Sequence, residues 1–265
     1  MKSPMYHITL SEEIKRLCPA FQGVAVMAQV TNSAHNSELW REIDAFTREL
    51  RAGETAESIK LQPAIAATRE AYKRCGKDPS RYRPSAEALR RRLMRGLELY
   101  QIDTLVDLIN LVSLRTGYSI GGFDADKIQG DSLELGIGRA EEPFEGIGRG
   151  TLNIEGLPVY RDRAGGIGTP TSDNERTKMG LETRRILAIV NGYNGREGLA
   201  EAAGMIQELL RKYADSDGET ILYFELNNDN KEMPPCKPVQ KNNTQNRPSI
   251  QTFHYICKTF YLKKN

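Results

Sequence analysis

Residues 102–130 read IDTLVDLINLVSLRTGYSIGGFDADKIQG, and this stretch decides the fold. From Thr104 onward, apolar side chains cover nearly the whole circumference of a helix, which predicts a buried helix that ends at Gly117. Its polar exceptions are Asp107, Asn110 and Ser113. Because buried polar groups need hydrogen-bond partners, these three side chains must bond the backbone, each other or a ligand.

The end of this helix leads directly into a glycine pair. Two glycines let a backbone approach a ligand closely. The segment therefore supplies candidate substrate-binding residues, although the residues alone favour a tight turn between helix and strand as the reason for the glycines. The candidates are Asn110, Arg115, Gly121, Gly122 and Asp124.

A second glycine-rich segment, residues 165–177, carries a dense set of polar side chains. Hydroxyls, a carboxylate and a guanidinium within a small volume suit an amino-acid ammonium, a ribose or a phosphate. The alternative to a binding site is a solvated surface loop without a ligand. We assign water and ribose positioning to Thr171, Ser172 and Asp173, and substrate binding to Thr169, Arg176 and Thr177.

Apolar periodicity outlines the remaining elements. Helices are expected at 38–51, 58–75, 85–97 and 197–213, and strands at 24–30, 133–137, 151–154, 158–161, 186–190 and 221–225. After residue 226 the composition becomes asparagine-rich and polar. We therefore expect one domain over 1–226 and a disordered tail over 227–265.

Charge is close to balanced overall, at +2, but it is unevenly distributed. Residues 69–95 hold ten basic and three acidic residues, an excess that can neutralise phosphates. A solvated helical surface without any partner is an equally good explanation. The RNA-binding candidates are Arg83, Arg91, Arg92 and Arg95.

Several classes of protein are disfavoured. The sequence has no apolar run of membrane-spanning length and no apolar signal segment at its start, so we expect a cytoplasmic protein. It has no HExxH motif and no Cys/His cluster, so we expect no metal and no cofactor.

The 102–130 stretch resembles the signature of the B3/B4 editing domain of phenylalanyl-tRNA synthetase β subunits, VDxTNYVxxxxGQPxHAFDxxKIxG in outline. The matching positions are Asp107, Asn110, Val112, Gly117, Phe123, Asp124, Lys127, Ile128 and Gly130. The resemblance implies an α/β (α+β) layered sandwich with a central β layer and flanking helices. It also implies a pocket for the amino-acid moiety of an aminoacyl-tRNA, in which water hydrolyses the ester. The expected partner is tRNA or aminoacyl-tRNA, with no membrane and no DNA.

Two departures from the family pattern leave the activity open. The family's histidine falls on Gly121, and its later glutamate aligns loosely with Ile189. The pocket is either emptied of catalytic groups or rebuilt around the 171–177 side chains. The leading hypothesis is trans-editing hydrolysis of mischarged tRNA. The alternatives are a non-catalytic RNA or aminoacyl-tRNA binding module and an amino-acid sensor.

Overall fold

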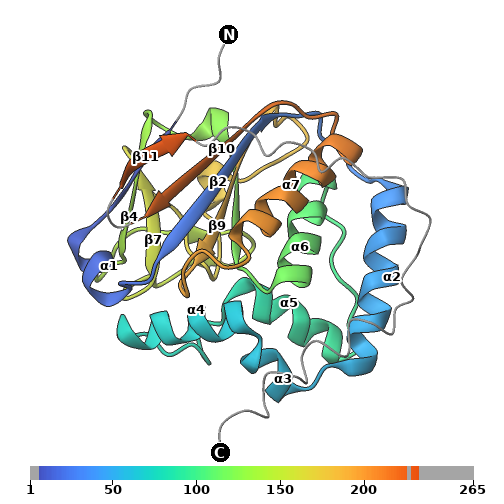
Figure 1. Ribbon diagram of the computed structural model, residues 1–265, viewed down its shortest axis with the longest axis horizontal. Helices are drawn as coiled ribbons and strands as arrows, with labels where there is room; N and C mark the ends of the chain where they lie inside the picture. The colour runs from blue at the N-terminus through green and yellow to red at the C-terminus, as the bar shows by residue number, and fades with distance from the viewer. Residues whose placement is uncertain (1–5, 226–227, 233–265) are drawn as a thin grey trace, which may run out of the picture. The chain divides into compact units, whose positions relative to one another are not determined.

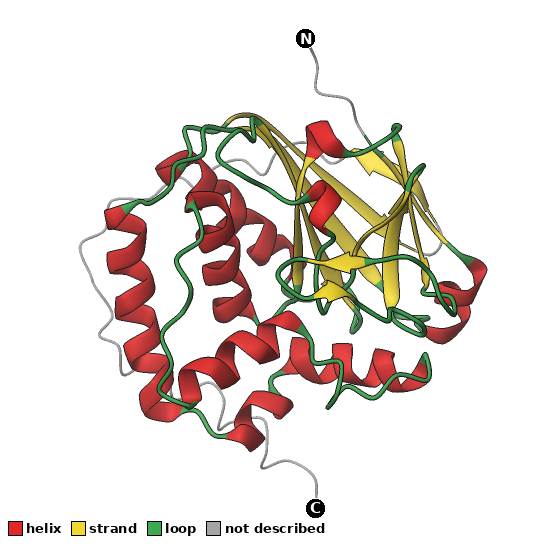
Figure 2. Ribbon diagram, turned by 180° about the vertical axis from the view of Figure 1, so that it is seen from behind, coloured by secondary structure: helices red, strands yellow, loops and turns green. Residues whose placement is uncertain are grey.

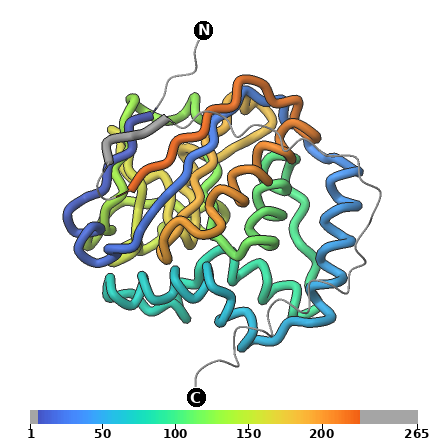
Figure 3. Tube along the Cα trace, viewed as in Figure 1, coloured from blue at the N-terminus to red at the C-terminus, as the bar shows by residue number. Residues whose placement is uncertain are grey.

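The computed structural model describes residues 6–225 and 228–232, with side chains only through residue 225. The central element is a five-stranded sheet whose neighbouring strands all run antiparallel. Its order is β11 (Asn228–Glu232), β10 (Asp217–Glu225), β2 (Gln22–Gln29), β9 (Arg185–Gly192) and β3 (Ile120–Asp124). Figure 3 shows strands from the two ends of the described chain side by side in this sheet.

A second sheet has four strands. Its order is β1 (His7–Leu10), β4 (Ser132–Ile137), β7 (Pro158–Asp162) and β8 (Gly165–Gly168), and β1 and β4 are parallel. A small ribbon of β5 (Glu145–Gly146) and β6 (Gly150–Thr151) precedes β7.

Seven helices accompany these sheets within the described residues. They are α1 (Glu12–Leu17), α2 (Ser37–Gly53), α3 (Ala56–Leu61), α4 (Pro63–Arg74), α5 (Ser85–Met94), α6 (Thr104–Thr116) and α7 (Leu199–Tyr213). Two short 3-10 turns are η1 (Ala125–Lys127) and η2 (Glu175–Thr177). Helices α2, α6 and α7 lie on one side of the strands, as Figures 1 and 2 show.

Strand β2 shows why the layers form. Its side chains alternate between two cores, as the two-residue period of a strand requires. Val24 and Val26 pack among side chains of α2, α6 and α7. Ala25 and Met27 pack against residues of the second sheet. The sheet is therefore buried on both faces at β2.

The predicted α/β layered fold is confirmed, and the structure adds a detail to it. Helices cover one face of the central sheet, and the second sheet covers the other face. Within the described residues, no helix has both the length and the apolar character that a membrane span needs.

Four elements differ from the sequence expectation. The strand expected at 151–154 is only the two-residue β6, and the helix expected at 58–75 is two helices, α3 and α4. The Gly121-Gly122 segment, expected as a turn, is strand β3, and the start of the 165–177 loop is strand β8. Glycine is depleted in strands, so the pattern gave no strand signal there. The two strands form because Phe123 and Ile167 bury fully in the core between the sheets.

The proposed tail over 227–265 falls mostly outside the described residues. Residues 228–232 form β11, which pairs with β10. The domain boundary at 226 remains a prediction.

Candidate functional site

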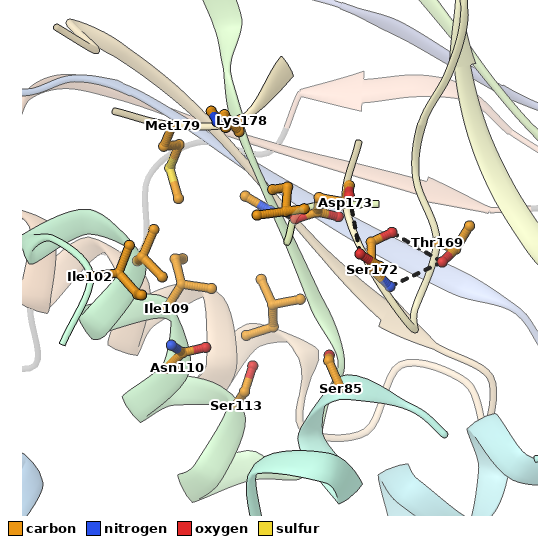
Figure 4. Close-up of a pocket in the computed structure, with 14 residues that line it drawn as sticks. Ser85, Ile102, Ile109, Asn110, Ser113, Thr169, Ser172, Asp173, Lys178 and Met179 are labelled. Atoms are coloured by element: carbon orange, nitrogen blue, oxygen red, sulfur yellow. Dashed lines mark hydrogen bonds between the residues drawn. The ribbon is translucent and has the colours of Figure 1, made fainter. Parts of the chain in front are cut away.

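A cavity of about 370 Å³ opens between helix α6, strand β3 and the segment after β8. Figure 4 shows Ile102, Ile109, Asn110 and Ser113 on one side of it and Thr169, Ser172 and Asp173 on another. The apolar lining comes from Ile102, Val106, Ile109, Ile120, Ile147 and Met179. The two glycine-containing segments singled out in the sequence, the one with Gly121 and Gly122 and the one over 165–177, thus both contribute residues to its lining.

Asp173 is the carboxylate of this cavity. Its Oδ2 accepts a hydrogen bond of 3.0 Å from the backbone N–H of Gly122. Within the part of the chain that the structure describes, Oδ1 has no hydrogen bond. Burial raises the pKa of Asp173 to about 7, and the single bond from Gly122 lowers it only in part.

Neighbouring glycines make room for this carboxylate. A methyl group placed on Gly168 would lie 2.6 Å from Asp173 Oδ1, and one on Gly121 would lie 3.5 Å from it. A side chain at Gly168 would also meet the ring of Phe123 at 2.6 Å. Gly168 in β8 therefore lets the carboxylate occupy a space that a side chain would otherwise fill.

The loop from Thr169 to Asp173 is held by its own hydrogen bonds. Thr169 Oγ1 accepts from the backbone N–H groups of Thr171 and Ser172, at 3.2 and 3.1 Å. The Thr169 N–H donates in turn to the carbonyl of Ser172, at 3.0 Å. The hydroxyl of Ser172 donates to the Asp173 carbonyl, at 3.1 Å. Thr169 therefore fixes the loop that carries Asp173.

Helix α6 forms the opposite wall. Asn110 and Ser113 lie one turn apart and both face the cavity. Asp107 faces elsewhere, because its carboxylate accepts from Trp40 Nε1 at 2.7 Å and from the Ile102 N–H at 3.1 Å. Burial raises the pKa of Asp107 to about 6. Asp107 therefore anchors the segment that brings Ile102 to the cavity.

Three predicted site residues from the 171–177 segment do not line the cavity. Thr171 is buried and shares a hydrogen bond of 2.9 Å with the hydroxyl of Tyr72. The Arg176 guanidinium donates to both oxygens of Asp162, at 2.8 and 2.9 Å. Thr177 is fully buried and donates to a backbone carbonyl. These side chains stabilise the loop through hydrogen bonds to groups that do not line the cavity.

Three further predicted residues also lie outside the cavity. The carboxylate of Asp124 accepts from the Thr183 hydroxyl at 2.9 Å. Arg115 pairs with Glu42 at 2.8 Å and borders a separate hollow between α4, α6 and α7. Gly121 lies opposite Ile189 in the β3–β9 register, and Ile189 packs in the core between the sheets. The two positions that depart from the family pattern therefore meet away from the cavity.

The predicted RNA-binding arginines divide into two groups. Arg91 and Arg83 lie 2.7 and 3.7 Å from the fully buried carboxylate of Glu87, which Arg69 also contacts at 2.8 Å. Part of their charge is thus compensated within the protein. Arg92 stacks over the Tyr100 ring at 3.8 Å, and Arg95 is exposed. Only these last two present charge from the C-terminal end of α5.

Several cavity residues were absent from the sequence prediction. They are Ser85, Ile102, Val106, Ile109, Ser113, Ile120, Ile147, Lys178 and Met179. Ser113 was detectable, because it is a polar exception on an otherwise apolar helix. The isoleucines were not detectable, because the sequence does not distinguish an apolar side chain that lines a cavity from one in the core.

Comparisons with known proteins give one family and one similar solved structure. The family model described as "B3/4 domain" matches residues 67–210, more than half of the chain. A solved N-terminal fragment of the phenylalanyl-tRNA synthetase β subunit from Pyrococcus horikoshii is similar in structure, with 14% identity and a TM-score of 0.46. The match covers 83% of this chain and 51% of that one, so the chain spans about half the length of that structure. No curated protein sequence matches.

Proposed function

The chain belongs to the B3/4 domain family, and on that premise we propose that it hydrolyses the ester bond of a mischarged aminoacyl-tRNA. In this proposal the aminoacyl group occupies the 370 Å³ cavity, and Asp173 activates the attacking water. The hydrolysis needs no covalent intermediate on the protein.

The observation that carries the proposal is the state of Asp173. A general base works best when its pKa lies near the working pH, and the pKa of Asp173 is raised to about 7. Its Oδ1 has no hydrogen bond to any described residue, so a water molecule in the cavity is a suitable partner. A carboxylate that only stabilised the fold would be expected to hold more partners than the single N–H of Gly122.

Water, the ester and Asp173 together account for every bond and proton of the hydrolysis. Asp173 accepts a proton from water while the water oxygen bonds to the ester carbonyl carbon. The bond between that carbon and the ribose oxygen breaks as the tetrahedral intermediate collapses. The proton passes to the ribose oxygen, which regenerates the carboxylate and leaves a free amino acid and an uncharged tRNA.

Helix α5 links this cavity to a positive surface. Its first residue, Ser85, lines the cavity, and its last turn carries Arg92 next to Arg95. The helix has 10 residues, a length of about 15 Å. We place the RNA backbone along this end, where the guanidinium groups of Arg92 and Arg95 neutralise phosphates.

A binding module without catalysis is the second candidate, and one observation favours it. Gly121 stands where the family pattern has a histidine, and Ile189, which is fully buried, aligns loosely with the family's glutamate. A chain that lost both groups could retain aminoacyl-tRNA and leave the ester intact.

Purified protein incubated with a panel of mischarged tRNAs separates the two candidates. We expect release of at least one amino acid above the buffer rate, and a loss of about 100-fold or more in Asp173→Asn. Asp126→Asn is the matched control, because Asp126 is an exposed carboxylate paired with Arg185. Retained activity in Asp173→Asn would exclude the proposed role of Asp173. Tight tRNA binding without any release would favour the binding module.

A further inference from the structure

Two cysteine side chains from distant parts of the sequence meet at the core between the sheets. Cys18 belongs to this core, and Cys75 packs against it. Cys18 directly follows helix α1, and Cys75 directly follows helix α4. Figure 1 shows α1 just above the end of α4. The two thiols are free and share a hydrogen bond. We call these two residues the thiol pair.

The two thiols differ in their access to solvent. Cys18 is fully buried, whereas Cys75 is half-buried and can meet a small molecule from solution. The exposed Arg74 guanidinium donates a hydrogen bond to the sulfur of Cys18. Reactive cysteines are partly exposed and lie beside positive charge, and the pair combines both properties.

The hydrogen bond between the thiols changes how they release protons. This bond lowers the pKa of Cys18, and Arg74 adds to the shift while burial opposes it. The same bond, together with burial, raises the pKa of Cys75. The pair therefore gives up one proton readily and holds the other between its two sulfurs. Because that proton can pass from Cys75 to Cys18, negative charge can lie on the sulfur that solvent reaches.

We propose that the thiol pair is a reversible redox site, at which a small-molecule disulfide such as oxidised glutathione converts Cys18 and Cys75 to an intramolecular disulfide. The Cys75 sulfur attacks one sulfur of the small disulfide, which forms a mixed disulfide and releases a small thiolate. The Cys18 sulfur then attacks the Cys75 sulfur, closes the Cys18–Cys75 bond and releases the second small thiolate. The two protons of the pair pass to the released thiolates, and the small disulfide takes up both electrons.

The disulfide ties helix α4 to the segment that precedes strand β2. One turn before Cys75, Tyr72 shares a hydrogen bond of 2.9 Å with Thr171, in the loop that carries Asp173. The closed loop from Cys18 to Cys75 spans about 60 residues, so closure restricts the unfolded chain strongly. The inference stands apart from the proposed function, since neither sulfur lines the cavity.

Mass spectrometry of protein oxidised with glutathione tests the proposal. The other cysteines of the sequence, Cys236 and Cys257, are replaced by serine, so that only the thiol pair can react. After incubation with oxidised glutathione and alkylation of the remaining free thiols, we expect peptides linked through Cys18 and Cys75, which dithiothreitol separates. Oxidation should also raise the melting temperature by about 5–10 °C.

Single variants in the same background separate the two steps. In Cys18→Ala, Cys75 should remain as a stable mixed disulfide with glutathione, because the second thiol is missing. In Cys75→Ala, the buried Cys18 should stay unmodified. Arg74→Gln should slow formation of the intramolecular disulfide severalfold. Lys73→Gln is the matched control, because Lys73 is exposed and pairs with Glu70.

Several results would overturn the proposal. One is the absence of the linked peptides, and another is a lasting mixed disulfide at Cys75 while Cys18 is present. A link that forms only when urea is added would also overturn it, because the folded protein would then not bring the two sulfurs together. An unchanged rate in Arg74→Gln would exclude Arg74 from the reaction. Melting curves recorded before oxidation establish that each variant is folded.

Discussion

Two clusters of polar groups adjoin helix α5, one around Glu87 and one in the cavity lined by Ser85, and their carboxylates have different numbers of partners. Glu87, fully buried, is surrounded by guanidinium groups of Arg69, Arg83 and Arg91. In the cavity, Asp173 has one backbone partner and Ser113 has none among the described residues. Glu87 therefore serves the fold, whereas the unpaired oxygen of Asp173 belongs to a cavity that can hold a ligand.

The comparison changes the interpretation of the basic sequence around α5. Ten basic residues over 69–95 indicated an RNA-binding face. The structure uses several of them internally, since Arg69 and Arg91 bind Glu87 and Arg90 binds Glu54. Local charge excess therefore overstates the charge that is available to a partner.

Removing Glu87 should give the largest effect on stability. Glu87→Ala leaves the surrounding arginines without their carboxylate, and loss of one partner from a buried ion pair costs about 3–5 kcal/mol. Urea unfolding monitored by circular dichroism measures the loss. The control is Glu57→Ala, whose carboxylate is 77% exposed in a surface pair with Lys60, with an expected loss below about 1 kcal/mol. Equal losses would contradict the structural role of Glu87.

Removing the charge of Asp173 should stabilise the protein, but only at higher pH. The pKa of Asp173 is about 7 in the folded state and about 3.9 in the unfolded state, so the unfolded state releases its proton first. Stability of the native protein is therefore lost as pH rises from about 4 to 7. Asp173→Asn should lack that loss.

Urea unfolding at two pH values measures this difference. We expect Asp173→Asn to be more stable than the native protein by about 1–2 kcal/mol at pH 8, after allowance for solvent in the cavity, and similar to it near pH 4. Asp126→Asn serves again as the exposed carboxylate control. A variant that is destabilised at pH 8 would mean that the carboxylate of Asp173 has favourable partners and that its pKa is not raised.

The smallest effect on stability is expected at Arg95. Its side chain is exposed, so Arg95→Ala should change the free energy of unfolding by less than about 0.5 kcal/mol.

If RNA binds at this end of α5, Arg95→Ala should weaken RNA binding and reduce the slope of log affinity against log salt concentration by about one unit. Arg91→Ala should instead lower stability, because it removes a bond to Glu87. Filter binding at several salt concentrations measures the slope, and an unchanged slope in Arg95→Ala would exclude Arg95 from the RNA contact.

Much of the fold and part of the site could be predicted from sequence. Helix α6 and strands β2 and β9 follow from their apolar patterns, because burial and periodicity are local properties. Asn110 and Asp173 followed from polar residues in unusual surroundings. Arg176 and Asp124 were misjudged as cavity residues, since their partners, Asp162 and Thr183, lie 14 and 59 positions away. Sequence marks a polar side chain as needing a partner but does not say whether the protein supplies one.

The sheet order has a consequence for how this chain folds as it is synthesised. Strand β2 pairs with β9 and β10, so its neighbours leave the ribosome long after it does, with a delay on the order of ten seconds. Strand β1 likewise waits for β4. Helices α2 and α6 emerge earlier and are available to shield the Val24 and Val26 side of β2. The other side, with Ala25 and Met27, stays uncovered until β4 and β7 emerge.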